Sequence, residues 1–108
     1  MARQLFMVLS EAVEGREDDY NDWYENTHLD EVIATSAVVS AQRFKLADRR
    51  GVEAPNRYLA IYEVEVDDPG EVFPSVDAGG DKRNNTDALD RSSLGAWVWT
   101  PIGVKHGG

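Results

Sequence analysis

The sequence contains no cysteine, few basic residues and no long apolar run. Without cysteine, the chain can form no disulfide, thiolate nucleophile or cysteine-ligated metal site. The absence also fits a reducing cytoplasm, where we expect the protein to be located. The 20 acidic residues outnumber the 11 basic ones and give a formal net charge of −9, so binding to nucleic acid or to an anionic membrane surface is not expected. No segment approaches the roughly 18 apolar residues of a membrane-spanning helix.

The remaining composition describes one small folded domain. Its 108 residues suit a single domain over positions 1–108. Apolar residues make up 42% and charged residues 29% of the chain, a balance typical of a globular protein. No set of His, Asp or Glu has metal-ligand spacing, and no glycine-rich phosphate loop is present. We therefore expect no metal and no cofactor.

The order of predicted elements indicates the fold class. Apolar runs and alternating patterns predict four strands, at residues 4–12, 38–46, 57–66 and 95–104. Helical patterns predict one long helix over 18–35, a short second helix over 71–76 that Pro74 interrupts, and one further helical turn over 86–90. The β-α-β-β-α-β order predicts an α+β, ferredoxin-like fold, with a four-stranded antiparallel sheet and helices on one face.

The predicted strands carry apolar side chains on both faces. In 57–66, Tyr58 and Tyr62 point one way, while Leu59 and Ile61 point the other way. Helices can cover only one face of such a sheet. The other face needs a partner, and a second copy of the chain is the simplest one.

Two further patterns assign side chains to faces. Over 38–46, alternation places Val39 with Ala41, Arg43 and Lys45 on one face, and Val38 on the other. In the long helix, four residues spaced by four form one stripe, and Leu29 lies well round to another side. These four residues are Tyr20, Tyr24, His28 and Val32.

Three segments resemble a known superfamily: YNDWYENTHLDEVIATSAVVSAQRFKL (20–46), RYLAIYEVE (57–65) and DALDRSSLGAWVWTPIG (87–103). Together they cover about half of the chain and are similar to the dimeric α+β barrel superfamily, within it to EthD-like and antibiotic-biosynthesis-monooxygenase-like small proteins. The resemblance implies a homodimer whose two sheets close into a β-barrel, with a small-molecule pocket between the sheet and the helices of each subunit. It implies cofactor-free chemistry of the lyase, isomerase or cyclase type, with monooxygenation less favoured.

Three residues are candidates for catalysis in such a pocket. His28 has an ordinary pKa near 6.5 and could act as a general acid or base. Tyr62 could donate a hydrogen bond to a substrate carbonyl, or it could equally pack in the dimer barrel. Glu63 could orient His28, although an ion pair between Glu63 and Arg43 is the preferred explanation for that carboxylate. The alternative for His28 is a packed helix residue, bonded to a backbone carbonyl or a carboxylate.

Four further residues are candidates for substrate binding: Trp23, Tyr24, Arg43 and Trp97. Large aromatics also dominate small cores, so packing in the core is the preferred explanation for Trp23 and Tyr24, and a ligand wall is the alternative. Two functions therefore stay open. One is a cofactor-free enzyme for an aromatic or polyketide-like metabolite with His28 as acid or base, and the other is a non-catalytic ligand-binding or structural homodimer.

Overall fold

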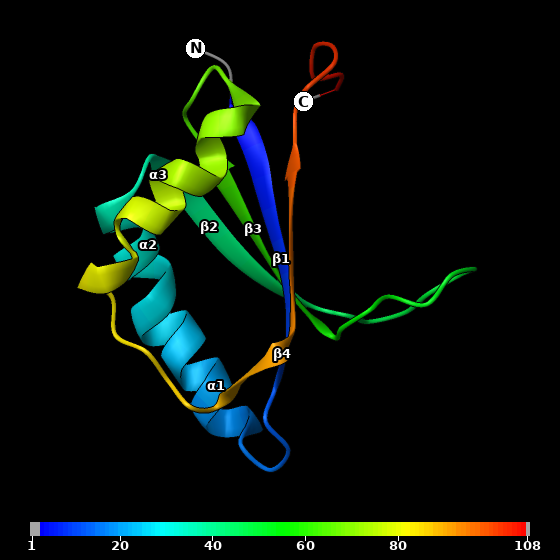
Figure 1. Cartoon of the computed structure of the whole chain (residues 1–108). Coiled ribbons are helices and arrows are strands. Elements are labelled where there is room, and N and C mark those ends of the chain that lie inside the picture. The colour runs from blue at the N-terminus through cyan, green and yellow to red at the C-terminus, as the bar shows by residue number, and fades with distance from the viewer. Residues whose placement is uncertain (1–2, 108) are drawn as a thin grey trace.

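A computed structural model describes residues 3–107 and shows an antiparallel sheet with helices on one face (Figure 1). The strands are β1 (Gln4–Ala12), β2 (Val38–Lys45), β3 (Tyr58–Val64) and β4 (Leu89–Trp99). They lie in the order β2-β3-β1-β4, and each neighbouring pair is antiparallel. The α+β class and the four-stranded antiparallel sheet are confirmed, and this arrangement is compatible with a ferredoxin-like fold.

The first helical segment runs without a break from residue 17 to residue 35. It comprises α1 (Glu17–Trp23), a π-helical turn (Tyr24–His28) and α2 (Leu29–Thr35). The three acidic residues of its first turn suit the positive end of the helix dipole.

The second helical segment comprises a 3-10 turn (Pro69–Glu71), α3 (Val72–Ala78) and a further 3-10 turn (Gly80–Lys82). The prediction that Pro74 interrupts this helix is wrong. Pro74 is the third residue of α3, in the first turn, where a missing N–H removes no hydrogen bond of the helix interior.

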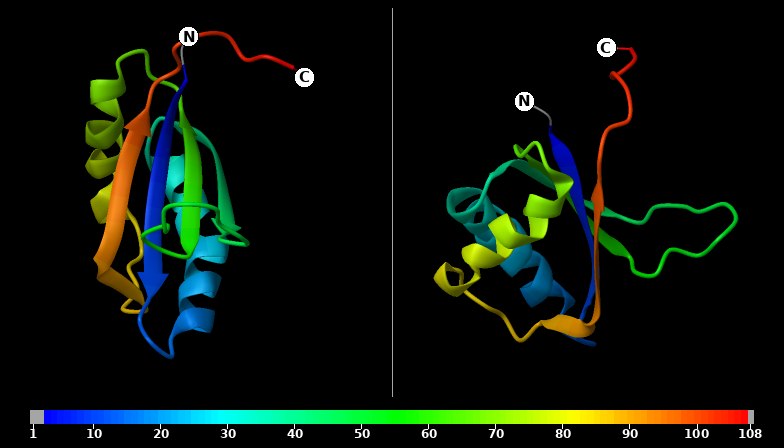
Figure 2. Two further views of the ribbon diagram at one scale, coloured as in Figure 1. Left: turned by 90° about the vertical axis from the view of Figure 1, so that its right-hand side faces the viewer. Right: turned by 45° about the horizontal axis from the view of Figure 1, so that its top comes forward.

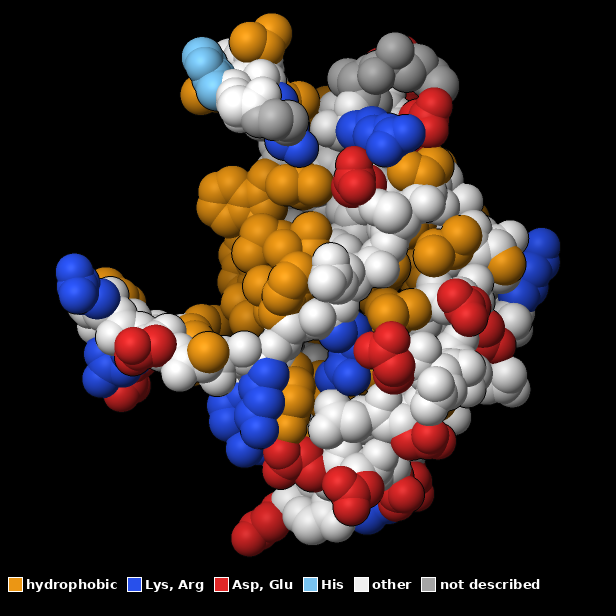
Figure 3. All heavy atoms as spheres, turned by 180° about the vertical axis from the view of Figure 1, so that it is seen from behind, with side chains coloured by type: hydrophobic (Ala, Val, Ile, Leu, Met, Phe, Trp, Pro, Cys, Tyr) orange, Lys and Arg blue, Asp and Glu red, His pale blue; other side chains and the backbone are white. Residues whose placement is uncertain are grey.

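The two faces of the sheet differ in burial. Alternate residues of β1 and β3 pack under the helices and form the sheet side of the core, namely Phe6, Val8, Tyr58, Ala60, Tyr62 and Val64. We call the other side of the sheet the open face, which carries Leu5, Met7, Leu9, Leu59, Ile61, Trp97 and Trp99. Apolar side chains gather on that side of the molecule (Figure 3). The alternation predicted for residues 57–66 is confirmed.

A β-bulge in β2 makes some of its side chains point to a different face from the one predicted. The pairing of β2 with β3 shifts between Val38 and Ser40, and the extra residue reverses the alternation at that point. Val38 is therefore buried, while Val39 is exposed. Beyond the bulge, Ala41 and Arg43 point to the helical side, as predicted.

The last strand also differs from the prediction. β4 begins at Leu89, six residues before the predicted start, and ends at Trp99. The helical turn predicted over 86–90 is absent, because those residues lead directly into the strand. The pairing of β4 with β1 is interrupted: one residue of β1, Ser10, lies opposite residues 91–94 of β4.

The connection between β2 and β3 projects from the molecule on the side away from the helices (Figure 2). We call residues 46–57 the arm. At its tip Gly51 has a φ of +83°, a conformation that favours glycine. The neighbouring Val52 is 91% exposed, so the tip of the arm lies open to solvent.

Candidate functional site

The π-helical turn changes which side chains face the sheet. The N–H of Leu29 donates to the carbonyl of Tyr24, five residues earlier, where an α-helix would make a four-residue bond. The turn therefore contains one extra residue, and the buried stripe continues from Tyr24 to Leu29 and Val32. The prediction that Leu29 lies on another side of the helix is wrong. His28 is displaced to the edge of the stripe, where it is half-buried.

A cleft of about 330 Å³ opens beside His28, between the π-helical turn, the end of α3 and the sheet. We call it the His28 cleft. Its apolar and aromatic lining is Phe6, Val8, Trp23, Tyr24, Val32, Tyr62, Val76, Leu89, Leu94 and Ala96. Its polar lining is His28, Asp77, Arg83, Asn85 and Arg91. A cleft of this size, mostly apolar with few polar groups, suits a small organic ligand.

The imidazole of His28 lies against aromatic rings and makes no hydrogen bond with any other described residue. It stacks on Trp23 with ring centroids 4.4 Å apart, and Tyr24 meets its edge at 5.1 Å. Its Nδ1 is buried without a hydrogen-bond partner among residues 3–107. If His28 were only a packed helix residue, we would expect a backbone carbonyl or a carboxylate as its hydrogen-bond partner. The described residues provide neither. A buried polar atom without a hydrogen-bond partner is unusual, and a functional role is one possible explanation for it.

Burial keeps His28 uncharged at neutral pH. Desolvation lowers its pKa from 6.5 to about 4, and the positive charge of Arg83 acts in the same direction. The carboxylate of Glu31 opposes both effects. A neutral imidazole can accept a proton or share one with a ligand.

Two tyrosines, Tyr24 and Tyr62, also line the cleft. Burial raises the pKa of Tyr62 to about 12, and a hydrogen bond with Tyr24 opposes that rise only in part. Burial also raises the pKa of Tyr24 well above its ordinary value. Both phenols are thus protonated at neutral pH. Tyr62 is held by stacking on Phe6, with centroids 5.3 Å apart.

The structure does not bring Glu63 to this cleft. Glu63 points to the open face, where it accepts hydrogen bonds from Ser40 at 2.8 Å and from Arg3 at 3.3 Å. The Ser40 and Arg3 bonds lower the pKa of its carboxyl group. The expected pairs of Glu63 with His28 and with Arg43 do not form among the described residues, because both candidate partners lie on the helical side of the sheet.

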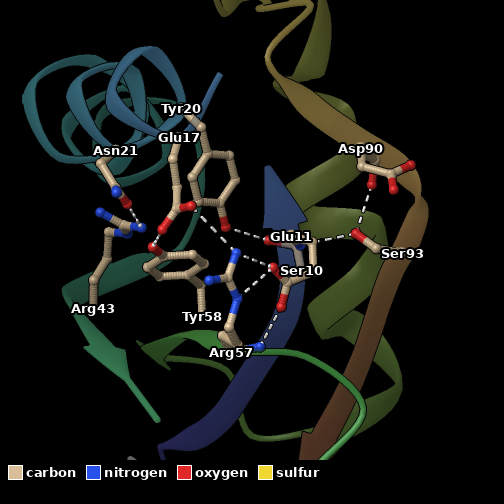
Figure 4. Close-up of polar contacts among 10 residues, drawn as sticks. All are labelled: Ser10, Glu11, Glu17, Tyr20, Asn21, Arg43, Arg57, Tyr58, Asp90 and Ser93. Carbon is tan, nitrogen blue, oxygen red and sulfur yellow. Dashed lines mark hydrogen bonds and ion pairs between the residues drawn. The ribbon is translucent and has the colours of Figure 1, made fainter. Parts of the chain in front are cut away.

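Arg43 and Trp97 also lie outside the cleft lining. Trp97 is on the open face and is 41% exposed. Arg43 lies beneath the first helix, where its Nη2 donates to the Oδ1 of Asn21 at 2.7 Å (Figure 4). Its guanidinium is 4.6 Å from the ring centroid of Tyr24. Arg43 therefore supports a wall of the cleft from behind.

A set of polar contacts fixes α1 on the sheet next to Arg43 (Figure 4). The hydroxyl groups of Ser10 and Tyr20 are 2.6 Å apart, and both side chains are buried. The phenol of Tyr58 donates to the carboxylate of Glu17, at the start of α1. These contacts join the helix to β1 and β3 and so set the height of the π-helical turn above the sheet.

The sequence did not point to Arg83, Asn85 and Arg91, which come from a polar loop and from the irregular part of β4. Two contacts hold that loop against the helix. The indole Nε1 of Trp23 donates to the carbonyl of Asn84 at 3.0 Å, and Glu31 accepts from the amide groups of Asn84. No local sequence pattern predicts the position of this loop, because the bonded partners are 53 to 61 residues apart in the chain.

Comparisons with models of known families, with curated proteins and with solved structures find no match to this chain. Within residues 3–107, no helix is long and apolar enough to cross a membrane. The same residues contain no group of three His, Asp or Glu side chains arranged to hold a metal ion.

Proposed function

We propose that the chain is a cofactor-free enzyme that binds a small aromatic or polyketide-like metabolite in the His28 cleft and transfers a proton within it. One observation carries the proposal. The π-helical turn offers an unpartnered histidine to a cleft that also contains two protonated phenols. π-helical turns are rare and are frequently found at functional sites.

The β4 irregularity strengthens this choice of site. The residues that lie opposite Ser10 include Arg91 and Leu94, and both line the His28 cleft. Bulges are over-represented next to active sites, where they redirect side chains. Two independent departures from regular structure, one in a helix and one in a strand, thus meet at the same cleft.

The chemistry follows from the protonation states. The neutral imidazole of His28 takes a proton from a carbon next to a substrate carbonyl. The electron pair of that C–H bond forms a carbon–carbon double bond, and the π electron pair of the carbonyl moves onto its oxygen. The phenol of Tyr62 donates a hydrogen bond to the enolate oxygen that forms. Return of the proton to another atom completes an isomerase-type reaction. Attack of the enolate carbon on a second carbonyl of the same substrate, whose oxygen then takes the proton, completes a cyclase-type reaction, and loss of a leaving group completes a lyase reaction.

An activity screen tests the proposal. Aromatic and polyketide-like ketones are screened by thermal shift, and each compound that stabilises the protein is then followed by absorbance and chromatography for conversion. We expect His28→Ala and Tyr62→Phe to abolish conversion, while His106→Ala, in the exposed C-terminal tail, leaves it unchanged. A compound converted equally well by all four proteins contradicts the proposal.

We further propose that the open face pairs with the open face of a second copy. Its centre is apolar across β3, β1 and β4, although the chain carries 31 charged side chains, 20 acidic and 11 basic. Trp97 and Trp99 remain 41% and 54% exposed in the single chain. Two such faces related by a twofold axis would cover one another, as in the barrel that the superfamily resemblance implies.

Sedimentation velocity tests the pairing. We expect a dimer at micromolar concentration and a monomer for Ile61→Glu, which places a charge at the centre of the open face. Ile33→Glu, on the exposed surface of α2, is the matched control and should remain dimeric. A wild-type protein that sediments only as a monomer contradicts the paired barrel and leaves the cleft chemistry untouched.

A further inference from the structure

We propose that the His28 cleft selects a planar ligand that carries an anionic oxygen group, and that the guanidinium groups of Arg83 and Arg91 bind this group. The inference deepens the proposed function, on which it rests, because it names the chemical class of the ligand for the same cleft. The anionic group is a carboxylate or an ionised enol or phenol, which present the same negatively charged oxygen to a guanidinium.

Arg83 is fixed in place by neutral groups. Its Nε donates to the Oγ1 of Thr35 at 2.9 Å, and its Nη2 donates to the carbonyl of Val76 at 2.8 Å. The side chain is half-buried and lines the cleft. Among residues 3–107 it has no acidic partner, and its Nη1 makes no hydrogen bond. The guanidinium of Arg83 is thus fixed in one orientation and still has N–H donors without an acceptor among the described residues. Binding of an anion there costs little side-chain conformational entropy.

Arg91 reaches the same cleft from the sheet. It belongs to the four residues of β4 that lie opposite Ser10 alone, and this irregularity brings it to the cleft lining. Within the described part of the chain, Arg91 makes no hydrogen bond and no ion pair. Arg91 is exposed, so its guanidinium is available to a ligand in the cleft.

The charge around the cleft is opposite to the charge of the whole chain. The chain carries a net charge of −9, yet the cleft lining contains two arginines and one acid, the exposed Asp77. The Arg83 charge also acts inside the cleft, since it lowers the pKa of both His28 and Tyr62. Both of those groups are uncharged at neutral pH, so neither would repel an anion.

The rest of the lining favours a flat ligand. Aromatic rings from three elements meet there: Trp23, Tyr62 and Phe6. Aromatic surfaces bind planar rings by offset or edge-to-face contact. The inference therefore joins a planar body, held by these rings, to a charged oxygen at the arginines.

Three probes with the same ring system test the inference: 2-naphthoate, 2-naphthamide and 2-naphthylmethylammonium. Binding is followed by NMR through the indole N–H signal of Trp23, which lines the cleft, and the signals of Trp97 and Trp99 on the open face serve as internal references. We expect 2-naphthoate to bind about tenfold more tightly than 2-naphthamide, because charge-assisted hydrogen bonds are roughly twice as strong as neutral ones. The ammonium compound should bind most weakly.

Two variants locate the source of the preference. Arg83→Gln and Arg91→Gln should each reduce the carboxylate-to-amide affinity ratio several-fold and leave the affinity for the amide unchanged. Arg91→Gln removes no hydrogen bond and no ion pair among residues 3–107, so it keeps the test decisive if Arg83→Gln fails to fold. Arg49→Gln, in the arm and paired with Glu53, is the matched control and should keep the full ratio.

The outcomes separate this inference from the proposed function. If 2-naphthamide shifts the Trp23 signal and binds as tightly as 2-naphthoate, the cleft binds planar ligands and the anion preference is wrong. If the preference persists in both cleft variants, the two arginines are not its source and the inference is overturned. If none of the three probes shifts the Trp23 signal, the proposed ligand site fails together with the inference.

Discussion

The low pKa of His28 makes the stability of the protein depend on pH. The unfolded chain exposes this imidazole, which then has its ordinary pKa of 6.5, whereas the folded chain lowers the pKa to about 4. Between these values the unfolded state binds the proton and the folded state does not. Stability therefore decreases as pH falls through this window, and above about pH 7 the group contributes nothing because it is neutral in both states.

The size of the effect follows from the difference in pKa. Each pKa unit corresponds to about 1.4 kcal/mol, so complete protonation would cost the folded state about 3 kcal/mol. At pH 5, where the unfolded chain is almost fully protonated at this site and the folded chain hardly at all, the cost is about 2 kcal/mol. A loss of this size is a substantial fraction of the total stability of a small domain.

Urea unfolding at pH 7.5 and pH 5 measures this cost. His28→Phe keeps a ring against Trp23 and cannot take up a proton, so we expect its stability to fall by about 2 kcal/mol less than that of the wild type between the two pH values. Three exposed carboxyl groups with lowered pKa also lose stabilisation on acidification. Their contribution is common to both proteins and cancels in the comparison.

Two controls complete the design. His106→Gln, in the exposed C-terminal tail, should follow the wild type at both pH values. The imidazole signals of His28 should titrate in NMR spectra with a midpoint near pH 4. Equal pH dependence for the wild type and His28→Phe, or a midpoint near 6.5, would refute the reasoning that burial and Arg83 keep this group neutral.

Three further predictions concern the scaffold and are measured by urea unfolding. Tyr20→Phe leaves the buried hydroxyl of Ser10 without its partner and should lower the free energy of unfolding by ~1–2 kcal/mol. Gly79→Ala should lower it by ~1–3 kcal/mol, because a Cβ there would lie 2.7 Å from a Cβ at the end of α2; Gly80→Ala, with no atom within 4 Å of the added Cβ, should be nearly neutral. Arg43→Gln removes a cation from three tyrosine rings and should cost ~1–2 kcal/mol; an unchanged midpoint would exclude its supporting role.

The sequence predicted most of the strands because burial follows a simple period along them. Over residues 58–64 every second side chain is buried, and β1 was predicted with its observed bounds. The sequence failed where an extra residue breaks the period. The bulge at Val39, the π-helical turn at His28 and the irregular part of β4 each insert residues that local propensity does not mark, because tertiary packing determines where they fall.

The same reasoning explains which parts of the candidate site were predicted. His28, Tyr24 and Trp23 are close in sequence and share one helical segment, so their spacing brought them together, and Tyr62 lies on the strand face opposite them. Arg83 and Arg91 reach the cleft through contacts over long sequence separations, which a single sequence does not reveal. The strand period places Glu63 on the same face as Leu59 and Ile61, but the sequence does not show which face of the sheet lines the pocket, so Glu63 stayed a candidate.

The extra residue of the π-helical turn is not required for packing of the core, but it determines where His28 lies relative to the cleft. Removal of one residue from 25–27 would leave Tyr20, Tyr24, Leu29 and Val32 on a single face of an ordinary α-helix, with the same core side chains buried. The core alone therefore gives no reason for the insertion. A chain shortened in this way would keep its hydrophobic stripe and lose the offset that presents His28. The insertion thus behaves as a spacer, held in the helix at some cost to its regularity, and it marks the point where the chain departs from the simplest packing solution.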